Sequence, residues 1–131
     1  MSIEIYRVEN SEGQGMYCGS SQAIQARGLN TQPNAVHPHP SQDSSIKEWY
    51  YSHHQREEHF FGFASLSQLR MWVHNQELRN KLSEQGFVIN VYIPSFTSPY
   101  IVTDFVIGDT QAIFNKSLFT IINTININSL T

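Results

Sequence analysis

The 131-residue chain contains a single cysteine, Cys18, so no internal disulfide can support its fold. Charge is also scarce, because Asp, Glu, Lys and Arg make up only 15% of the residues and leave a net charge of −3. No basic block occurs, and we therefore expect no direct binding to nucleic acid. Membrane-spanning apolar runs are missing too, and Met1–Ile5 lacks the basic and apolar regions of a secretion signal. These absences predict a soluble, cytoplasmic protein that does not bind membranes.

The sequence contains enough hydrophobic residues to form the core of one folded domain. Hydrophobic residues make up 40% of the chain and aromatic residues 12%. A chain of this length buries about two thirds of its unfolded surface on folding. Composition of this kind disfavours disorder. We predict a single domain that spans residues 1–131.

The clearest local signal is a strand-like aromatic run, Phe60–Phe63, that passes into an amphipathic helix. Ser65 is followed three residues later by Gln68, which is the pattern of a capping box. We predict that the main helix starts at Ser65 or Leu66 and ends near Asn75. Across helix and strands, the residues expected in the core are Phe63, Leu69, Trp72, Val73, Val88, Val91, Ile93, Val102 and Ile113.

Alternating apolar residues, bounded by turn residues, predict the strands. The turn at Gly108-Asp109 predicts a hairpin between the last two of them. A strand, then loops and helices, then several strands is the order of an α+β domain with a mainly antiparallel sheet, either continuous or split. The predicted strands are Ile3–Val8, Phe87–Ile93, Tyr100–Ile107 and Thr110–Phe114.

Short helices and one long loop fill the rest of the chain. Residues 28–45 form a loop that contains three prolines, and a loop this long is often functional. The tail, residues 118–131, fits both helical and strand spacing, so its structure stays open. Leu78 and Leu82 should be buried, and Glu77 should face Lys81. The short helices are predicted at Ser20–Arg27 (ended by Gly28), at Ile46–Tyr51, and after Asn75 (ended by Gly86).

Six histidines raise the question of a metal site. His37 and His39 have Asp43 nearby, but Pro38 holds the two imidazoles extended and pointing roughly apart. No His-Glu-x-x-His pattern occurs, and one cysteine cannot build a structural zinc site. We expect no metal, with histidines in loops and on the surface, and a partly buried Cys18 rather than a nucleophile. The remaining histidines considered as ligands are His53, His54 and His59.

Three separated segments resemble small ADP-ribosyltransferase-like domains in their order and spacing. They are Tyr6-Arg7 on the first strand, Phe63-Ala64-Ser65 before the main helix, and Asp109–Phe114 at a late strand. That family has an aromatic–Arg or aromatic–His pair on an early strand, a serine-centred strand end, and a glutamate that opens a late strand. The resemblance implies a split sheet with a cleft that receives NAD.

The resemblance also implies roles for individual residues. Arg7, which with Gln111 would be catalytic, would contact a phosphate or ribose, and Tyr6 beside it would also bind the cofactor. Ser65 would support the ribose side, and Tyr50 or Tyr51 would stack on nicotinamide. Arg7, as an exposed or cleft-lining residue, is expected to add little to folding stability.

Gln111 would occupy the position of the catalytic acid, where the family has a glutamate. A neutral amide can form hydrogen bonds but lacks the charge that stabilises an oxocarbenium-like transition state. The alternatives are weakened catalysis, catalysis by Gln111 itself as in some atypical members, or a fold retained for binding. A further alternative is that Arg7 and Gln111 are polar residues on exposed strand faces.

A second resemblance is to small single-domain proteins carried by phages and prophages. It rests on the succession Tyr6–Asn10, His37-Pro38, Phe61–Phe63 and Gln68-Leu69. It implies a role in phage–host conflict, in the cytoplasm of the bacterial host cell. The target would be a host or defence protein, which the chain either modifies or, as a catalytically inactive inhibitor or adaptor, binds.

Overall fold

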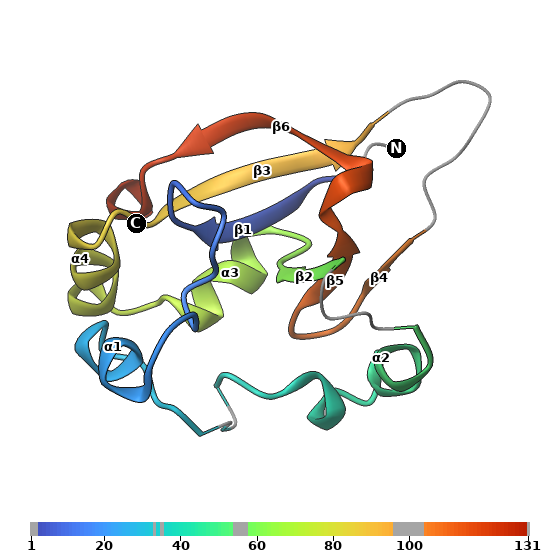
Figure 1. The fold of residues 1–131 in the computed structure, drawn as a ribbon, viewed down its shortest axis with the longest axis horizontal. Helices are drawn as coiled ribbons and strands as arrows, with labels where there is room; N and C mark the ends of the chain where they lie inside the picture. Colours follow the sequence, from blue (N-terminus) through green and yellow to red (C-terminus); the bar gives the residue numbers. More distant parts are fainter. Residues whose placement is uncertain (1–2, 33, 35, 54–57, 96–103, 131) are drawn as a thin grey trace.

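The fold is mixed α+β, as the sequence predicts. The computed structural model describes residues 3–32, 34, 36–53, 58–95 and 104–130. Within these residues the chain forms two three-stranded antiparallel sheets and four α-helices (Figure 1). The elements are β1 (Ile5–Glu9), α1 (Ser21–Ala26), the 3-10 helix η1 (Pro40–Gln42), α2 (Lys47–His53), β2 (His59–Gly62), α3 (Leu66–Trp72), α4 (Gln76–Glu84), β3 (Val88–Pro94), β4 (Phe105–Ile107), β5 (Ala112–Asn115), η2 (Lys116–Leu118), β6 (Phe119–Ile125) and η3 (Ile127–Ser129).

The predicted strands are divided between two sheets. Sheet A has the strand order β1-β3-β6, and sheet B has the order β2-β5-β4. The two are linked where Tyr6 and Phe63 exchange backbone hydrogen bonds of 2.8 and 2.7 Å. The sheet is therefore split.

The predicted hairpin is confirmed as the antiparallel pair β4–β5, closed by a hydrogen bond from Gly108 N to the Gln111 carbonyl. Its second strand begins at Ala112, later than predicted. Of the predicted strand Tyr100–Ile107, the part up to residue 103 lies outside the described residues.

Two hydrophobic clusters hold these layers together. The larger one joins α3 and α4 to one face of sheet A, and the smaller one packs Ile5 and Tyr92 of sheet A against Ala112 and Phe114 of sheet B. Most of the predicted core is confirmed as buried, namely Phe63, Leu69, Trp72, Val73, Val91 and Ile113. Val88 and Ile93 are only half-buried, because they lie at or near the ends of β3, and Val102 is outside the described residues.

The short helices follow the predicted capping signals. Ser20 caps α1, which Gly28 ends at a φ of +82°, and Asn75 caps α4, which Gly86 ends at a φ of +85°. The predicted Glu77–Lys81 pair is present at 3.3 Å. Leu82 is buried as expected, whereas Leu78 is only half-buried. The predicted helix at Ile46–Tyr51 is α2, shifted to Lys47–His53.

The prediction that the main helix reaches Asn75 is wrong. Helix α3 ends at Trp72 because Val73 leaves helical geometry, with a φ of −123°, and Asn75 instead caps the next helix. Of the described helices the nine-residue α4 is the longest, so the domain is not organised around α3 alone. No described helix is long and apolar enough to cross a membrane.

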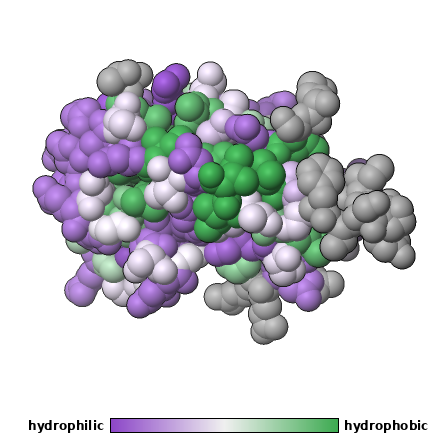
Figure 2. All heavy atoms as spheres, turned by 90° about the horizontal axis from the view of Figure 1, so that it is seen from above, coloured by the Kyte–Doolittle hydropathy of each residue, from purple (hydrophilic) through white to green (hydrophobic). Residues whose placement is uncertain are grey.

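The tail, whose structure the sequence left open, forms a strand. β6 pairs with β3 and lies at the edge of sheet A, at the top of Figure 1. After it, Ile127 and Leu130 return into the larger core cluster. Figure 2 looks down onto this edge and shows a hydrophobic patch near the middle of the face.

The capping role of Ser65 gives a first prediction. Its hydroxyl accepts a hydrogen bond from Gln68 N at 3.1 Å, at the start of α3. Ser65→Ala should lower the free energy of unfolding by about 1 kcal/mol. Ser67→Ala, at an exposed position within the same helix, is the control and should change stability little. Urea denaturation measures both, and equal losses in the two variants would contradict the capping role.

Candidate functional site

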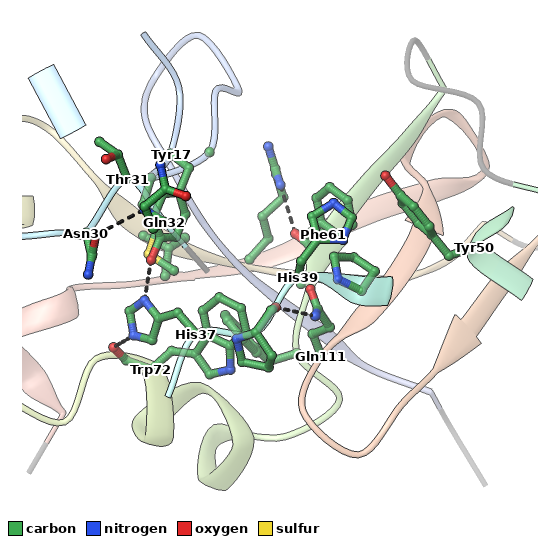
Figure 3. A pocket seen from close by; sticks show the side chains of 18 residues that line it. Tyr17, Asn30, Thr31, Gln32, His37, His39, Tyr50, Phe61, Trp72 and Gln111 are labelled. Atoms are coloured by element: carbon green, nitrogen blue, oxygen red, sulfur yellow. Dashed lines mark hydrogen bonds between the residues drawn. The ribbon is translucent and has the colours of Figure 1, made fainter. Parts of the chain in front are cut away.

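A cleft of about 530 Å³ opens between the loop after β1, the long loop 28–45, β2 and the end of α3. Figure 3 shows Tyr17, His37 and Trp72 gathered at one end of it and Tyr50 at the other. Phe61 and Phe63 add further aromatic surface. The cleft is thus mostly apolar and aromatic, and its size is that of pockets that bind small organic ligands.

The structure brings together only part of the predicted site. Arg7, Gln111 and Tyr50 line the cleft, whereas Tyr6, Ser65 and Tyr51 do not. The Tyr6 hydroxyl donates to Glu4 at 2.7 Å, and the Ser65 hydroxyl is used as a helix cap. Tyr51 has 67% of its surface exposed and meets Tyr50 edge-on. Of Arg7, Ser65 and Gln111, which the resemblance implies around one cleft, Arg7 and Gln111 line it and Ser65 does not.

Arg7 is a buried residue with 6% of its surface exposed, so the alternative of an exposed strand face is wrong for it. It is equally wrong for Gln111, which is 3% exposed. The Arg7 guanidinium donates from Nε to Glu9 at 2.8 Å, from Nη1 to the Phe61 carbonyl at 2.8 Å, and from Nη2 to the Gly13 carbonyl at 3.2 Å. Arg7 thus joins β1, β2 and the loop after β1.

Glu9 provides the carboxylate that holds Arg7 in place. It is 1% exposed, and it also accepts hydrogen bonds from Lys116 at 3.2 Å, from Asn90 at 2.7 Å and from the Tyr92 hydroxyl. Burial alone would raise the pKa of Glu9, but the hydrogen bonds from Tyr92 and Asn90 and the charge of Arg7 outweigh it and lower the pKa. The group is therefore a paired, ionised carboxylate.

The long loop 28–45 forms a wall of the cleft because polar side chains fix it to the turn before β5. Gln111 Nε2 donates to the Pro38 carbonyl at 3.0 Å. Asp43 accepts from the backbone N–H and the hydroxyl of Thr110, at 3.0 and 2.6 Å, and from Ser45. Burial opposes ionisation of Asp43, but these hydrogen bonds prevail and lower its pKa.

His37 closes one end of the cleft, where its ring lies between Trp72 and Tyr17. Its ring stacks on Trp72, and its Nε2 donates to the Trp72 carbonyl, which can only accept. In the neutral ring, which has no second N–H, Nδ1 accepts from the Tyr17 hydroxyl. Burial lowers the pKa of His37 and raises the pKa of Tyr17 to about 12, which keeps both groups uncharged at neutral pH.

The expectation that the histidines lie in loops and on the surface is wrong for His59, which is 5% exposed in β2 and, like His53, packs against Trp49. His39 caps η1, and His59 contacts Asp104 at 2.8 Å, while His54 lies outside the described residues. Among the described residues no group of three His, Cys, Asp or Glu side chains is arranged to hold a metal ion. Cys18 is half-buried against the core, as predicted.

Sequence reasoning missed several residues of the cleft. Tyr17, His37 and Trp72 form one end of it, and nothing in their local sequence marks them as neighbours. Phe61 lies in the aromatic run Phe60–Phe63, which the sequence analysis singles out, so for this residue the sequence did contain a signal. The cleft is built by the tertiary structure rather than by a motif.

A comparison with known protein families gives a match over nearly the whole chain. Residues 1–128 match the sequence profile of the bacteriophage T4 Y00F protein. The chain belongs to this phage protein family. The match confirms the phage origin implied by the second resemblance, and it leaves the resemblance to ADP-ribosyltransferase-like domains a prediction. No curated protein and no solved structure gives a significant match.

Burial of Arg7 reverses the expectation that it adds little to stability. Arg7→Ala should lower the free energy of unfolding by roughly 3–5 kcal/mol, since it removes one partner of a buried ion pair. Lys116→Ala is the matched comparison: Lys116 binds the same carboxylate, but its side chain is 23% exposed, so the loss should be smaller. Urea denaturation measures the loss of unfolding free energy in both variants. A loss for Lys116→Ala that equals or exceeds the loss for Arg7→Ala would contradict this account of the network.

His37 predicts a pH dependence of stability. Its pKa is lowered from 6.5, so on acidification below about pH 6.5 the unfolded chain takes up a proton that the folded chain refuses. The free energy of unfolding should therefore fall as the pH drops below about 6.5, and His37→Phe should flatten this part of the profile. The carboxylates with lowered pKa, such as Glu9 and Asp43, lose their contributions only at lower pH. Parallel profiles for parent and variant over this range would contradict the assignment.

Proposed function

We propose that this phage protein binds NAD or a related nucleotide in the cleft and acts on a host or defence protein in the cytoplasm of the infected cell. The observation that carries the proposal is the combination of one guanidinium, that of Arg7, with aromatic walls in a cleft of about 530 Å³. Aromatic walls suit a planar base or nicotinamide ring, and a guanidinium suits a phosphate.

The charges around Arg7 support an anionic ligand. Among the described residues that line the cleft, Arg7 is the one with a formal charge when the histidines are neutral. Arg7 and Lys116 share the single carboxylate of Glu9, so this group of three charges carries a net positive charge. A charge-assisted hydrogen bond from such a site to a phosphate contributes about 1.5–3 kcal/mol.

Transfer of ADP-ribose is the finer proposal, and it rests on the resemblance rather than on the cleft. The described lining residues include no carboxylate, and Gln111 uses its amide N–H to hold the Pro38 carbonyl. We therefore place binding ahead of catalysis. The second candidate function is that of a catalytically inactive inhibitor or adaptor that docks on a host protein, and the exposed ring of Tyr51 beside Tyr50 favours it.

Neighbouring tyrosines offer a matched test of nucleotide binding. Tyr50 lines the cleft, whereas Tyr51 is exposed and outside it. Loss of a stacked ring costs about 1–3 kcal/mol, so Tyr50→Ala should weaken NAD binding by roughly tenfold or more, and Tyr51→Ala should leave it unchanged. Isothermal titration calorimetry with NAD measures both. These variants avoid the loss of stability expected for Arg7→Ala.

Two outcomes would change the proposal. A parent protein that binds no NAD at millimolar concentration would end the nucleotide proposal and leave the inhibitor or adaptor. Binding without transfer, shown by mass spectrometry of host lysate incubated with NAD and the protein, would retain the binding function and remove the transferase.

A further inference from the structure

The Arg7 guanidinium carries two N–H groups that no described residue accepts. A guanidinium has five N–H donors. In Arg7, Nε donates to Glu9, while Nη1 and Nη2 each donate once, to the carbonyls of Phe61 and Gly13. One N–H on Nη1 and one on Nη2 therefore have no acceptor among the described residues, although Arg7 is only 6% exposed. Because a buried donor without an acceptor costs free energy, these two groups favour a ligand that supplies one.

Gly15 lies beside these donors and, like Arg7, lines the cleft. A methyl group placed on Gly15 would lie 3.1 Å from Nη2 and 3.4 Å from Nη1 of Arg7, closer than to Cζ at 3.6 Å. It would thus stand beyond the edge of the guanidinium that Nη1 and Nη2 form. The φ of Gly15 is not positive, so the backbone does not need a glycine here. What the glycine supplies is space in front of the two donors.

The guanidinium is also held in one orientation. Its three hydrogen bonds go to three different residues, and Cζ lies 5.1 Å from the centre of the Phe60 ring in a cation–π contact. A planar fork that is fixed in advance loses little freedom when it binds an anion. Val8, Met16 and Phe63 add apolar surface to the same cleft. In such surroundings a hydrogen bond to an anion is stronger than in water.

We propose that the Nη1–Nη2 edge of Arg7, left open by the missing side chain at Gly15, is a subsite that binds two oxygens of a phosphate group. Two parallel N–H···O bonds from one guanidinium are a frequent mode of phosphate recognition. Gly15 is then the residue that determines the preference for phosphorylated over unphosphorylated ligands. This inference rests on the proposed nucleotide-binding function, and it adds where the phosphate binds and which residue admits it.

AMP and adenosine test the subsite, since they differ only in the phosphate. The parent protein should bind AMP about tenfold more tightly than adenosine, or better. Gly15→Ala should abolish this preference, because its methyl group covers both donors, and it should leave the affinity for adenosine unchanged. Ser11→Ala, at an exposed residue of the same loop and outside the cleft, is the control and should bind AMP like the parent. Isothermal titration calorimetry measures all of these affinities.

A titration of the parent with inorganic phosphate depends neither on the variant nor on nucleotide binding. Phosphate should shift the nuclear magnetic resonance signal of the Arg7 Nε–H, and sodium chloride at the same ionic strength should not. Adenosine binding by Gly15→Ala shows that this variant folds, and if it is lost, the phosphate titration of the parent decides.

Three results would overturn the subsite: equal affinities of the parent for AMP and adenosine, a Gly15→Ala variant that keeps the preference for AMP, or an Arg7 signal that phosphate does not shift. Equal affinities for AMP and adenosine would still retain nucleotide binding. Conversely, a phosphate-dependent shift in a protein that binds neither AMP, adenosine nor NAD would retain the subsite and end the nucleotide proposal.

Discussion

The buried carboxylate of Glu9 is the constraint on which most of the arrangement depends. An isolated buried charge is strongly unfavourable, so Glu9 is tolerated only when its partners surround it. Those partners come from β1, from β3 and from the segment after β5. Arg7 and Lys116 both also donate to the Gly13 carbonyl, which fixes the loop after β1. One ionised group thereby sets sheet A, the end of β5 and one wall of the cleft relative to each other.

The long loop 28–45 shows how polar tethers can replace regular structure. Apart from the short η1, it has no helix or strand among its described residues. Asp43 binds the turn before β5, Gln111 holds the Pro38 carbonyl, and His37 reaches the Trp72 carbonyl. Each of these contacts also satisfies a buried polar group, which would otherwise cost free energy. The cleft wall is therefore part of the folded domain.

The sequence predicts what is decided within a few residues. Ser20 and Asn75 cap helices, and Gly28 and Gly86 end them, because these interactions act within a single turn. The pairing of strands that lie far apart in the chain leaves no comparable local signal in the sequence. The division into two sheets, the choice of strand for the tail and the burial of Arg7 all depend on partners far along the chain, such as Asn90 and Lys116. For the same reason Arg7 and Gln111 were placed at one site by resemblance, while Tyr17 and His37 were missed.

Gln111 illustrates how fold and site share residues. At this position the family that the sequence resembles has a glutamate, yet here the side chain must donate to the Pro38 carbonyl. An ionised carboxylate has no proton to donate, and it would face the carbonyl oxygen with like partial charge. The fold as it stands therefore favours an amide over a carboxylate at residue 111. Since Arg7 is likewise bound to Glu9, both residues of the cleft that resemble catalytic groups already serve the structure, and this is the physical reason to expect binding before catalysis.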